Sequence, residues 1–324
     1  MNKAHFLLLF FIIFLLSCEK KTDATIRKAT GKINTISVII DDQLWNGEVG
    51  DSIRNKFASP VIGLPDEEPL FTINQYPAKL MEGFITDSRI IIVVKKENKN
   101  EFSVTKNQYA TPQKVFHIAG KTTAEILEIL EKRTPQIIEI SKQTEIDESQ
   151  RITNLSLQNT SRIKTAFHVS VRLPSSYLYA FQKNQFIWLK KEIPSGNTSI
   201  LMYQVPISSL KNKSNAIENI IKMRDSIGNL YIRGIEPDTN MITEEGYAPY
   251  LFKTKLDGKE TFETKGTWEL KNDFMSGPFI NYAIVDTKNN RILVLEGLCY
   301  SPSKEVRDLR HELESIIKSV RFLK

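Results

Sequence analysis

The chain of 324 residues has 41% hydrophobic and 25% charged residues, and its formal net charge is +6. These proportions are ordinary for a globular protein, and the length allows one large domain or two of usual size. Basic residues occur in pairs such as Lys95-Lys96 and Lys190-Lys191 rather than in long runs, which argues against a nucleic-acid-binding stripe and a nucleic-acid partner.

The first 17 residues have the pattern of an export signal. Lys3 supplies a positive charge, and residues 6–16 are an unbroken apolar run. This run is shorter than the roughly 20 apolar residues that cross a bilayer, but it suits a signal peptide. The closing Leu15-Leu16-Ser17-Cys18 resembles the lipobox of bacterial lipoproteins. We therefore predict a lipoprotein signal peptide over residues 1–17 and lipidation of Cys18; an ordinary signal peptide or an uncleaved anchor is the alternative.

Residues 18–33 are polar and are predicted to form a flexible tether between the lipid and the folded part. The resemblance to lipoproteins implies a membrane partner through the N-terminal lipid and a place in the cell envelope. We expect the anchor in the outer membrane and the folded part in the periplasm, with exposure at the cell surface left open. Lipidation uses one of the two cysteines, so Cys299 has no disulfide partner and is expected to be a buried, inert thiol.

Residues 34–160 are predicted to form an N-terminal α+β domain. Its expected strands cover residues 34–40, 90–94, 102–105 and 115–119. A first helix is expected over residues 43–57 and a second over 122–132. Thr134-Pro135 has the pattern of an N-cap with proline at the first helical position, which predicts a third helix to about residue 152. The polar residues after it, near 160, mark the predicted domain boundary.

Residues 161–324 are predicted to form a C-terminal α+β domain. The expected order is a strand (165–173), a short helix (175–182), two strands (186–191 and 199–205) and a helix that begins near residue 214. Two hairpins follow, 250–256 with 261–270 and 279–285 with 291–300. The last helix has its apolar residues on one face from Val306 to Val320. The predicted class is therefore α+β, with two domains that each consist of a mainly antiparallel sheet covered by helices.

Several short stretches, in order along the chain, resemble an uncharacterised family of Bacteroidota lipoproteins, domain-of-unknown-function family 4837. They are residues 44–51 (LWNGEVGD), 63–65, 109–113, 223–225, 239–243, 266–269 and 274–279. Ser276 departs from the family pattern, which has a second glycine there. The resemblance implies a cell-envelope lipoprotein with no known activity. The last hairpin and the helix Arg307–Phe322 are similar in topology to the end of PsbP/Mog1-like sandwiches.

The chain has none of the short motifs that identify common enzymes. It lacks a Gly-x-Ser-x-Gly elbow, a His-Glu-x-x-His pair and a cysteine cluster for a metal. We therefore expect no cofactor and no metal, and we leave catalysis open while favouring a non-catalytic protein.

Five charged residues form a candidate polar cluster. Glu269 and Glu296 lie within apolar strands, where a carboxylate is costly to bury unless it faces solvent or is paired. If they faced Arg224 or Arg310, the cluster could bind a polar ligand or hold the sheet to its helices, and we favour the second interpretation. Asp225 follows Arg224 and is included in the cluster.

The strand and loop around residue 274 form the candidate partner surface. It consists of Trp268, Phe274, Met275, Gly277, Pro278 and Phe279. Exposed aromatic and methionine side chains suit recognition of a protein, whereas the same residues could instead close the edge of the core. The sequence thus predicts a binding or assembly module for an envelope protein partner. The alternative is an envelope hydrolase or transferase, or a small-ligand binder, with its site between the two domains.

Overall fold

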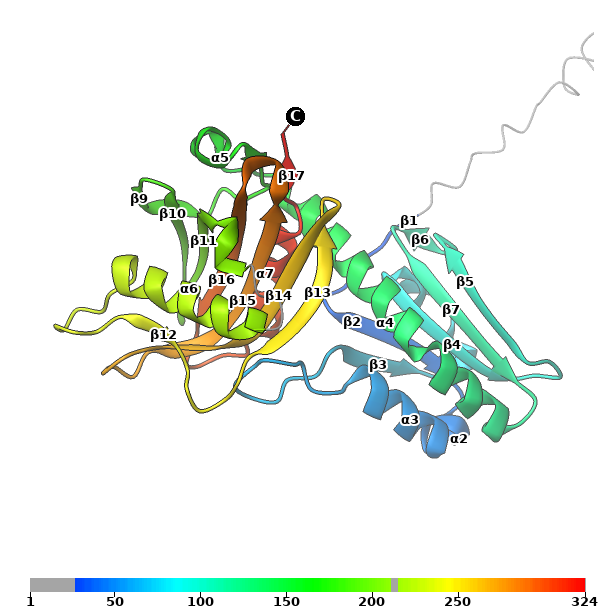
Figure 1. Cartoon of the computed structure of the whole chain (residues 1–324). Coiled ribbons are helices and arrows are strands. Elements are labelled where there is room, and N and C mark those ends of the chain that lie inside the picture. Colours follow the sequence, from blue (N-terminus) through cyan, green and yellow to red (C-terminus); the bar gives the residue numbers. More distant parts are fainter. Residues whose placement is uncertain (1–26, 211–214, 324) are drawn as a thin grey trace, which may run out of the picture.

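The computed structural model describes residues 27–210 and 215–323, which contain two main sheets and six α-helices (Figure 1). The predicted signal peptide, the predicted lipidation site Cys18 and the tether as far as residue 26 lie outside these residues. Within them, no helix has both the length and the apolar character needed to cross a membrane. Most strand pairings are antiparallel, and the predicted α+β class is confirmed.

The sheet of the N-terminal domain is mainly parallel, which corrects the expectation of a mainly antiparallel one. Its strand order is β3 (Thr72–Tyr76), β2 (Thr35–Ile40), β4 (Ile90–Lys96), β7 (Lys114–Gly120) and β5 (Glu101–Lys106). Only β5 runs antiparallel to its neighbour. Long crossovers such as α2 (Asp42–Trp45) and α3 (Glu48–Phe57) return the chain to the starting edge, which makes successive strands parallel.

Both faces of this sheet are covered, which explains the unbroken apolar run in β4. Helices α3 and α4 (Thr123–Thr153) pack on one face, over a core that includes Ile36, Ile92 and Phe116. The short 3-10 helices η2 (Ala78–Leu80) and η3 (Gly83–Asp87) lie over the other face. A strand buried on both faces reads as a continuous hydrophobic stretch, as parallel strands usually do.

Helix α4 is one helix of 31 residues rather than the two predicted. Thr122 caps it and forms a reciprocal capping box with Glu125. Pro135 lies inside the helix, and the hydroxyl of Thr134, predicted to be an N-cap, donates instead to the carbonyl of Leu130 at 2.7 Å. The first part of α4 packs on the N-terminal sheet and the second part contacts α7 (Arg307–Ile317) of the C-terminal domain (Figure 1).

The C-terminal sheet has eight strands, all paired antiparallel. Its order is β12 (Met241–Thr243), β14 (Lys259–Leu270), β15 (Ser276–Asp286), β16 (Arg291–Tyr300), β11 (Gly196–Pro206), β10 (Phe186–Ile193) and β9 (Leu178–Lys183), with β13 (Tyr250–Leu256) also on β14. Helix α6 (Ala216–Tyr231) covers one face. Helices α5 (Ser161–Phe167) and α7 cover the other. The predicted hairpins β13–β14 and β15–β16 are confirmed.

Two short elements differ from the sequence prediction. The predicted strand at 165–173 begins within helix α5 and contains only the short strand β8 (Val169–Ser170), which pairs with β17 (Arg321–Phe322). The predicted helix at 175–182 is the edge strand β9, which pairs with β10. In both segments tertiary pairing decides the structure, because a segment of six or seven residues has only weak intrinsic preference.

The beginning of the described chain is fastened to the N-terminal domain. Strand β1 (Arg27–Lys28) pairs with β6 (Ala110–Thr111), and Thr30 forms an isolated bridge with Ser88. Residues 27–33 are therefore held by hydrogen bonds, which corrects the prediction that they belong to a flexible tether.

Candidate functional site

Two members of the predicted polar cluster form a fully buried ion pair. Arg224 of α6 donates through Nε and Nη2 to Oε1 of Glu296 on β16, at 2.9 and 2.7 Å. Both side chains have no exposed surface. The guanidinium carbon lies 3.4 Å from the ring centre of Phe279, and Asn281 donates to the other Glu296 oxygen at 2.6 Å. These contacts satisfy both charges and fasten α6 to the sheet.

Of the other three members, only Asp225 is linked to this pair, through the hydroxyl of Thr243, which accepts from Arg224. Asp225 accepts hydrogen bonds from the backbone N–H and the hydroxyl of Thr243, both at 2.8 Å, and so attaches α6 to β12. Glu269 alternates with the buried Trp268 and Leu270, so it points to the opposite face of β14. Arg310 lies on α7 and donates to the carbonyl of Ile62 at 2.7 Å. The geometry supports the interpretation that the cluster holds helices to the sheet.

The predicted partner surface is divided between core and solvent. Trp268, Gly277, Pro278 and Phe279 are buried, Met275 is half-buried and Phe274 is fully exposed. Trp268 Nε1 donates to the carbonyl of Cys299 at 3.2 Å, and a Cβ atom on Gly277 would lie 2.0 Å from that oxygen. Strand β15 begins at Ser276. Residues 277–279 are therefore part of the sheet, and only Phe274 is available to a partner.

A second fully exposed hydrophobic side chain, which the sequence did not single out, lies in a loop joined to the turn that carries Phe274. The turn 271–275 and the loop 233–239, which we call the distal loops, are joined where the N–H of Lys271 bonds to the carbonyl of Asn240 at 2.9 Å. Ile235 in the second loop is 99% exposed. Figure 1 shows both loops projecting from the end of the C-terminal domain farthest from the N-terminal domain. The sequence feature that could have identified Ile235 is its position as an isolated apolar residue within the polar stretch around Pro237.

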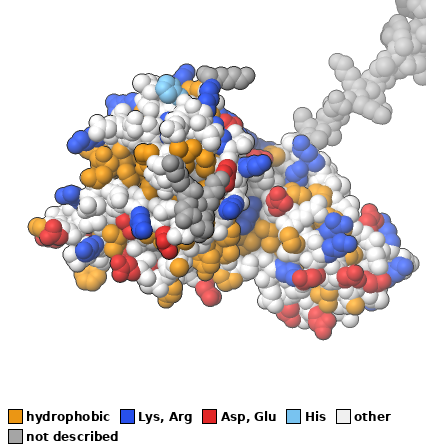
Figure 2. Space-filling view, in the orientation of Figure 1, with side chains coloured by type: hydrophobic (Ala, Val, Ile, Leu, Met, Phe, Trp, Pro, Cys, Tyr) orange, Lys and Arg blue, Asp and Glu red, His pale blue; other side chains and the backbone are white. Residues whose placement is uncertain are grey.

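The surface around the distal loops is mixed in character. Figure 2 shows hydrophobic side chains on this side of the C-terminal domain, with charged groups of both signs among them. The charged residues of the distal loops are Arg233, Glu236, Asp238, Lys271 and Asp273. Two exposed apolar side chains with a polar surround have the composition of a protein-binding patch.

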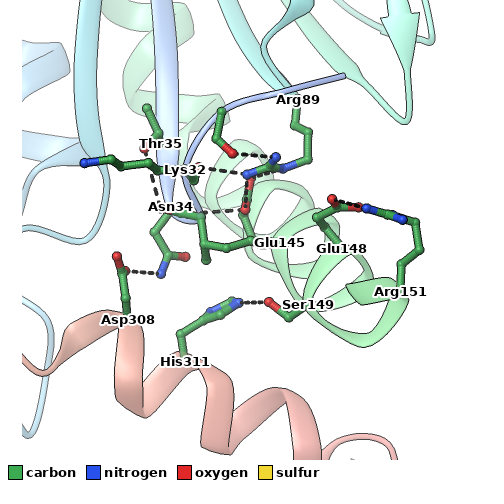
Figure 3. Close-up of polar contacts among 12 residues, drawn as sticks. Lys32, Asn34, Thr35, Arg89, Glu145, Glu148, Ser149, Arg151, Asp308 and His311 are labelled. Carbon is green, nitrogen blue, oxygen red and sulfur yellow. Dashed lines mark hydrogen bonds and ion pairs between the residues drawn. The ribbon is translucent and has the colours of Figure 1, made fainter. Parts of the chain in front are cut away.

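A second group of residues, at the domain junction, was not predicted as a site (Figure 3). Glu145 of α4 is fully buried and accepts hydrogen bonds from Arg89 Nε and Nη2 at 3.2 and 3.1 Å. The backbone N–H of Asn34 also donates to it, at 3.3 Å. Burial raises the pKa of Glu145, although Arg89 acts in the opposite direction. Through Arg89 and Asn34, these bonds attach α4 to the starts of β4 and β2.

Helix α7 is attached to the N-terminal domain at several points. Glu68 accepts from the backbone N–H groups of Val306 and Arg307, at 2.7 and 2.8 Å, and so caps α7 from the other domain. Asn34 donates to Asp308 at 2.9 Å, and Ser149 bonds to His311 Nε2 at 3.0 Å. The polar end of α4 is buried because Ser149 and Gln150 bond to α7, Ser149 to His311 and Gln150 to the carbonyl of Ser315.

The Ser149–His311 pair lines a groove of about 650 Å³ between the domains, together with Ile33, Ile152 and Leu309. Burial lowers the pKa of His311, so its imidazole is neutral near pH 7 and can accept a proton. A serine nucleophile also needs N–H donors for the developing oxyanion. Ser149 lies inside α4, whose N–H groups are already bonded within the helix. In the described residues no three metal-ligating side chains come together.

Comparisons with known proteins divide the chain near the end of α4. The family model described as "Domain of unknown function (DUF4837)" matches residues 156–319, about half of the chain. A second model, "Domain of unknown function (DUF8532)", matches residues 29–154. The predicted resemblance to family 4837 is confirmed for the C-terminal part, and the stretches at 44–51, 63–65 and 109–113 fall in the second match. No curated protein matches the sequence.

Solved structures with similar folds are distant in sequence. The Ran-binding protein Mog1p of Saccharomyces cerevisiae is 8% identical, with a TM-score of 0.33 and coverage of 48% of this chain and 91% of that one. A mutant of the protein Mog1 gives 10% identity, a TM-score of 0.32 and coverage of 48% and 92%. Human StAR-related lipid transfer protein 5 gives 7% identity, a TM-score of 0.24 and coverage of 53% and 94%.

Proposed function

The chain belongs to the family described as domain of unknown function DUF4837, and we propose that it is a lipid-anchored binding module of the cell envelope. In this proposal Cys18 carries the lipid, the folded part lies in the periplasm, and the distal loops bind an envelope protein. The protein has no catalytic role. The observation that carries the proposal is the pair of exposed apolar side chains, Ile235 and Phe274, on adjoining loops.

Burial of these two side chains would supply a favourable contact. A phenylalanine or isoleucine moved from water into an apolar environment gains about 1.5–3 kcal/mol. An anionic membrane surface is a poorer match, because Glu236, Asp238 and Asp273 lie in the same loops. A protein surface with complementary charges accommodates residues of both signs, so we favour a protein partner.

The proposal is tested by crosslinking in cells that express the full chain, followed by purification of the lipidated protein from membranes and mass spectrometry. One envelope protein should be recovered in stoichiometric amount, and Ile235→Ala with Phe274→Ala should reduce its recovery at least tenfold. Tyr250→Ala, which removes another exposed aromatic of the same domain, is the matched control and should leave recovery unchanged. Recovery of no partner, or equal recovery with both variants, would overturn the proposal.

The groove at the domain junction supports a second candidate, a hydrolase, transferase or small-ligand site between the domains. The observation in its favour is the Ser149–His311 hydrogen bond at the edge of the groove. A panel of ester and amide substrates offered to the wild-type protein and to Ser149→Ala distinguishes the two functions. Turnover that disappears in Ser149→Ala would favour the enzyme, whereas no turnover above that of the variant is expected for a binding module.

A further inference from the structure

The segment 77–88 of the N-terminal domain has one face on the core and an apolar face on the surface. Ile85 and Thr86 are buried against the sheet, where they cover Ile39 and Ile91. On the outer side, Phe84 is 74% exposed and Leu80 is 46% exposed. The ring of Tyr76 meets Phe84 edge-on, with 6.4 Å between ring centres. We call the outer side of this segment the apolar ridge.

The apolar ridge lies beside the point where the described chain begins. Arg27 donates to the carbonyl of Gly83 at 3.2 Å and to the hydroxyl of Thr86 at 3.0 Å. It also forms an ion pair with Asp87 at 3.1 Å. The backbone N–H of Thr30 bonds to the Asp87 carbonyl at 2.8 Å. Residue 27 is therefore fixed directly against the residue that precedes Phe84.

The chain between Cys18 and Arg27 limits how far this ridge can lie from the membrane. Nine residue steps separate the two positions. A fully extended chain covers at most about 3.6 Å per step, so Arg27 lies within about 30 Å of a lipid attached to Cys18. Arg27 is bonded to Gly83, Thr86 and Asp87, residues on either side of Phe84, so the tether brings the ridge within this distance of the bilayer.

We propose that the apolar ridge contacts the bilayer, with Phe84 and Leu80 in the interfacial region. This inference rests on the proposed lipidation of Cys18. Lys28 and Lys79 are exposed next to Arg27 and Leu80 and face anionic headgroups. Glu82 is the exposed acidic residue that opposes them, and Asp87 is paired with Arg27. An apolar contact added to a lipid anchor strengthens attachment, and it also fixes the orientation of the protein on the membrane.

This orientation has a consequence for the distal loops. The domains are fastened through Glu68, Ser149 and α7, so a contact at the ridge orients the whole molecule. The distal loops project from the end of the C-terminal domain farthest from the N-terminal domain, which carries the ridge (Figure 1). A partner in the periplasm, rather than a lipid of the same membrane, would then meet them.

The test uses lipidated protein reconstituted into vesicles of phosphatidylethanolamine and phosphatidylglycerol in a 3:1 ratio. A fluorophore that brightens in apolar surroundings is attached to Phe84→Cys, or to Phe274→Cys as the matched control. Each variant offers one reactive thiol, because Cys18 carries lipid and Cys299 is fully buried. On reconstitution into the vesicles, the emission of the fluorophore at position 84 should increase at least twofold. Nitroxide-labelled lipid should quench this emission. The emission of the fluorophore at position 274 should not change on reconstitution.

A label at a second position tests the contact while Phe84 and Leu80 both remain in place. Attached to Glu82→Cys, the fluorophore should report the same quenching, and Phe84→Ala with Leu80→Ala should reduce that quenching at least twofold. Equal signals at positions 84 and 274, or quenching at position 82 that the double variant does not change, would overturn the inference. Intact mass of the same preparation reports lipid on Cys18. Failure of the anchor and failure of the ridge contact are thereby distinguished.

Discussion

The guanidinium of Arg224 is held by a carboxylate, an aromatic ring and a hydroxyl in a part of the C-terminal domain that water does not reach. A charge in such surroundings is stable only while its partner is present. The residue that looked most like a ligand site is therefore better explained as a fastening between α6 and the sheet.

Loss of one partner should accordingly be severe. Glu296→Ala leaves Arg224 buried without a counter-charge, and we expect a loss of about 3–5 kcal/mol in the free energy of unfolding. Chemical denaturation of the mature chain measures this loss. Replacement of both residues, Arg224→Met with Glu296→Met, should recover most of it, because no unpaired charge then remains. A single variant as stable as the double one would contradict the structural role.

The thiol of Cys299 gives a second prediction. Burial raises its pKa to about 12, so almost none is present as the reactive thiolate at neutral pH. A thiol reagent at pH 8 should therefore label lipid-free protein with Cys18→Ser at least a hundred times more slowly than it labels the unfolded chain. Labelling at equal rates in the folded and unfolded protein would show that the strand face is open to solvent.

Elements with local signals could be predicted from the sequence, and elements fixed by distant contacts could not. The two long hairpins and the amphipathic last helix are encoded in turn residues and apolar spacing. The direction of β2, β3 and β4 depends on crossovers, and the pattern of a strand does not contain it. Pro135 suggested a helix start, but packing of α4 on both domains outweighs the loss of one hydrogen bond.

The candidate site residues also divide into those with a local sequence signal and those fixed by distant contacts. Arg224 and Glu296 were placed in one candidate cluster because charges within apolar elements need partners, but the sequence did not show whether Glu296 faces Arg224 or Arg310. Glu68, Glu145 and His311 were not identified, because their partners lie on other elements and are 56–239 residues away. Ile235 was missed because a single apolar residue in a loop has no periodicity to reveal it.

The cap on α7 gives a prediction at the level of this helix. Glu68→Ala removes the acceptor of two N–H groups and a negative charge at a helix N-terminus, so we expect a loss of about 1–2 kcal/mol in the free energy of unfolding. Glu67→Ala, at the exposed neighbouring position, is the control and should change stability by less than about 0.5 kcal/mol. Equal effects of the two variants would show that the cap does not contribute.

The two domains are held together at their junction, and this junction contains a titratable group. His311 lies on α7, near Asp308, Glu314 and Lys318, and bonds to Ser149 of α4. Burial lowers its pKa below the ordinary value of 6.5. At a pH between the folded and unfolded pKa values of His311, the unfolded chain binds a proton that the folded protein does not bind. The free energy of unfolding that depends on His311 is therefore complete above pH 6.5 and decreases as the pH falls below it.

Measurement between pH 7.5 and 5.5 isolates this effect from most carboxylates. The free energy of unfolding should decrease toward pH 5.5, and His311 should contribute a slope of at most about 1.4 kcal/mol per pH unit. His311→Gln should remove this contribution and leave that of His117, whose pKa burial also lowers. His168→Gln, at an exposed position, should leave the slope unchanged. The same slope in His311→Gln as in the wild type would assign the pH dependence to other groups.

The most direct test of the account is photocrosslinking in living cells from single positions on the full chain. A photoreactive phenylalanine analogue is placed at Phe274, at Ile235, or at Ile152 beside the junction groove. The account predicts that positions 274 and 235 yield the same envelope protein and that position 152 does not. A protein adduct from position 152 alone, with none from the distal loops, would contradict it and place the binding site between the domains.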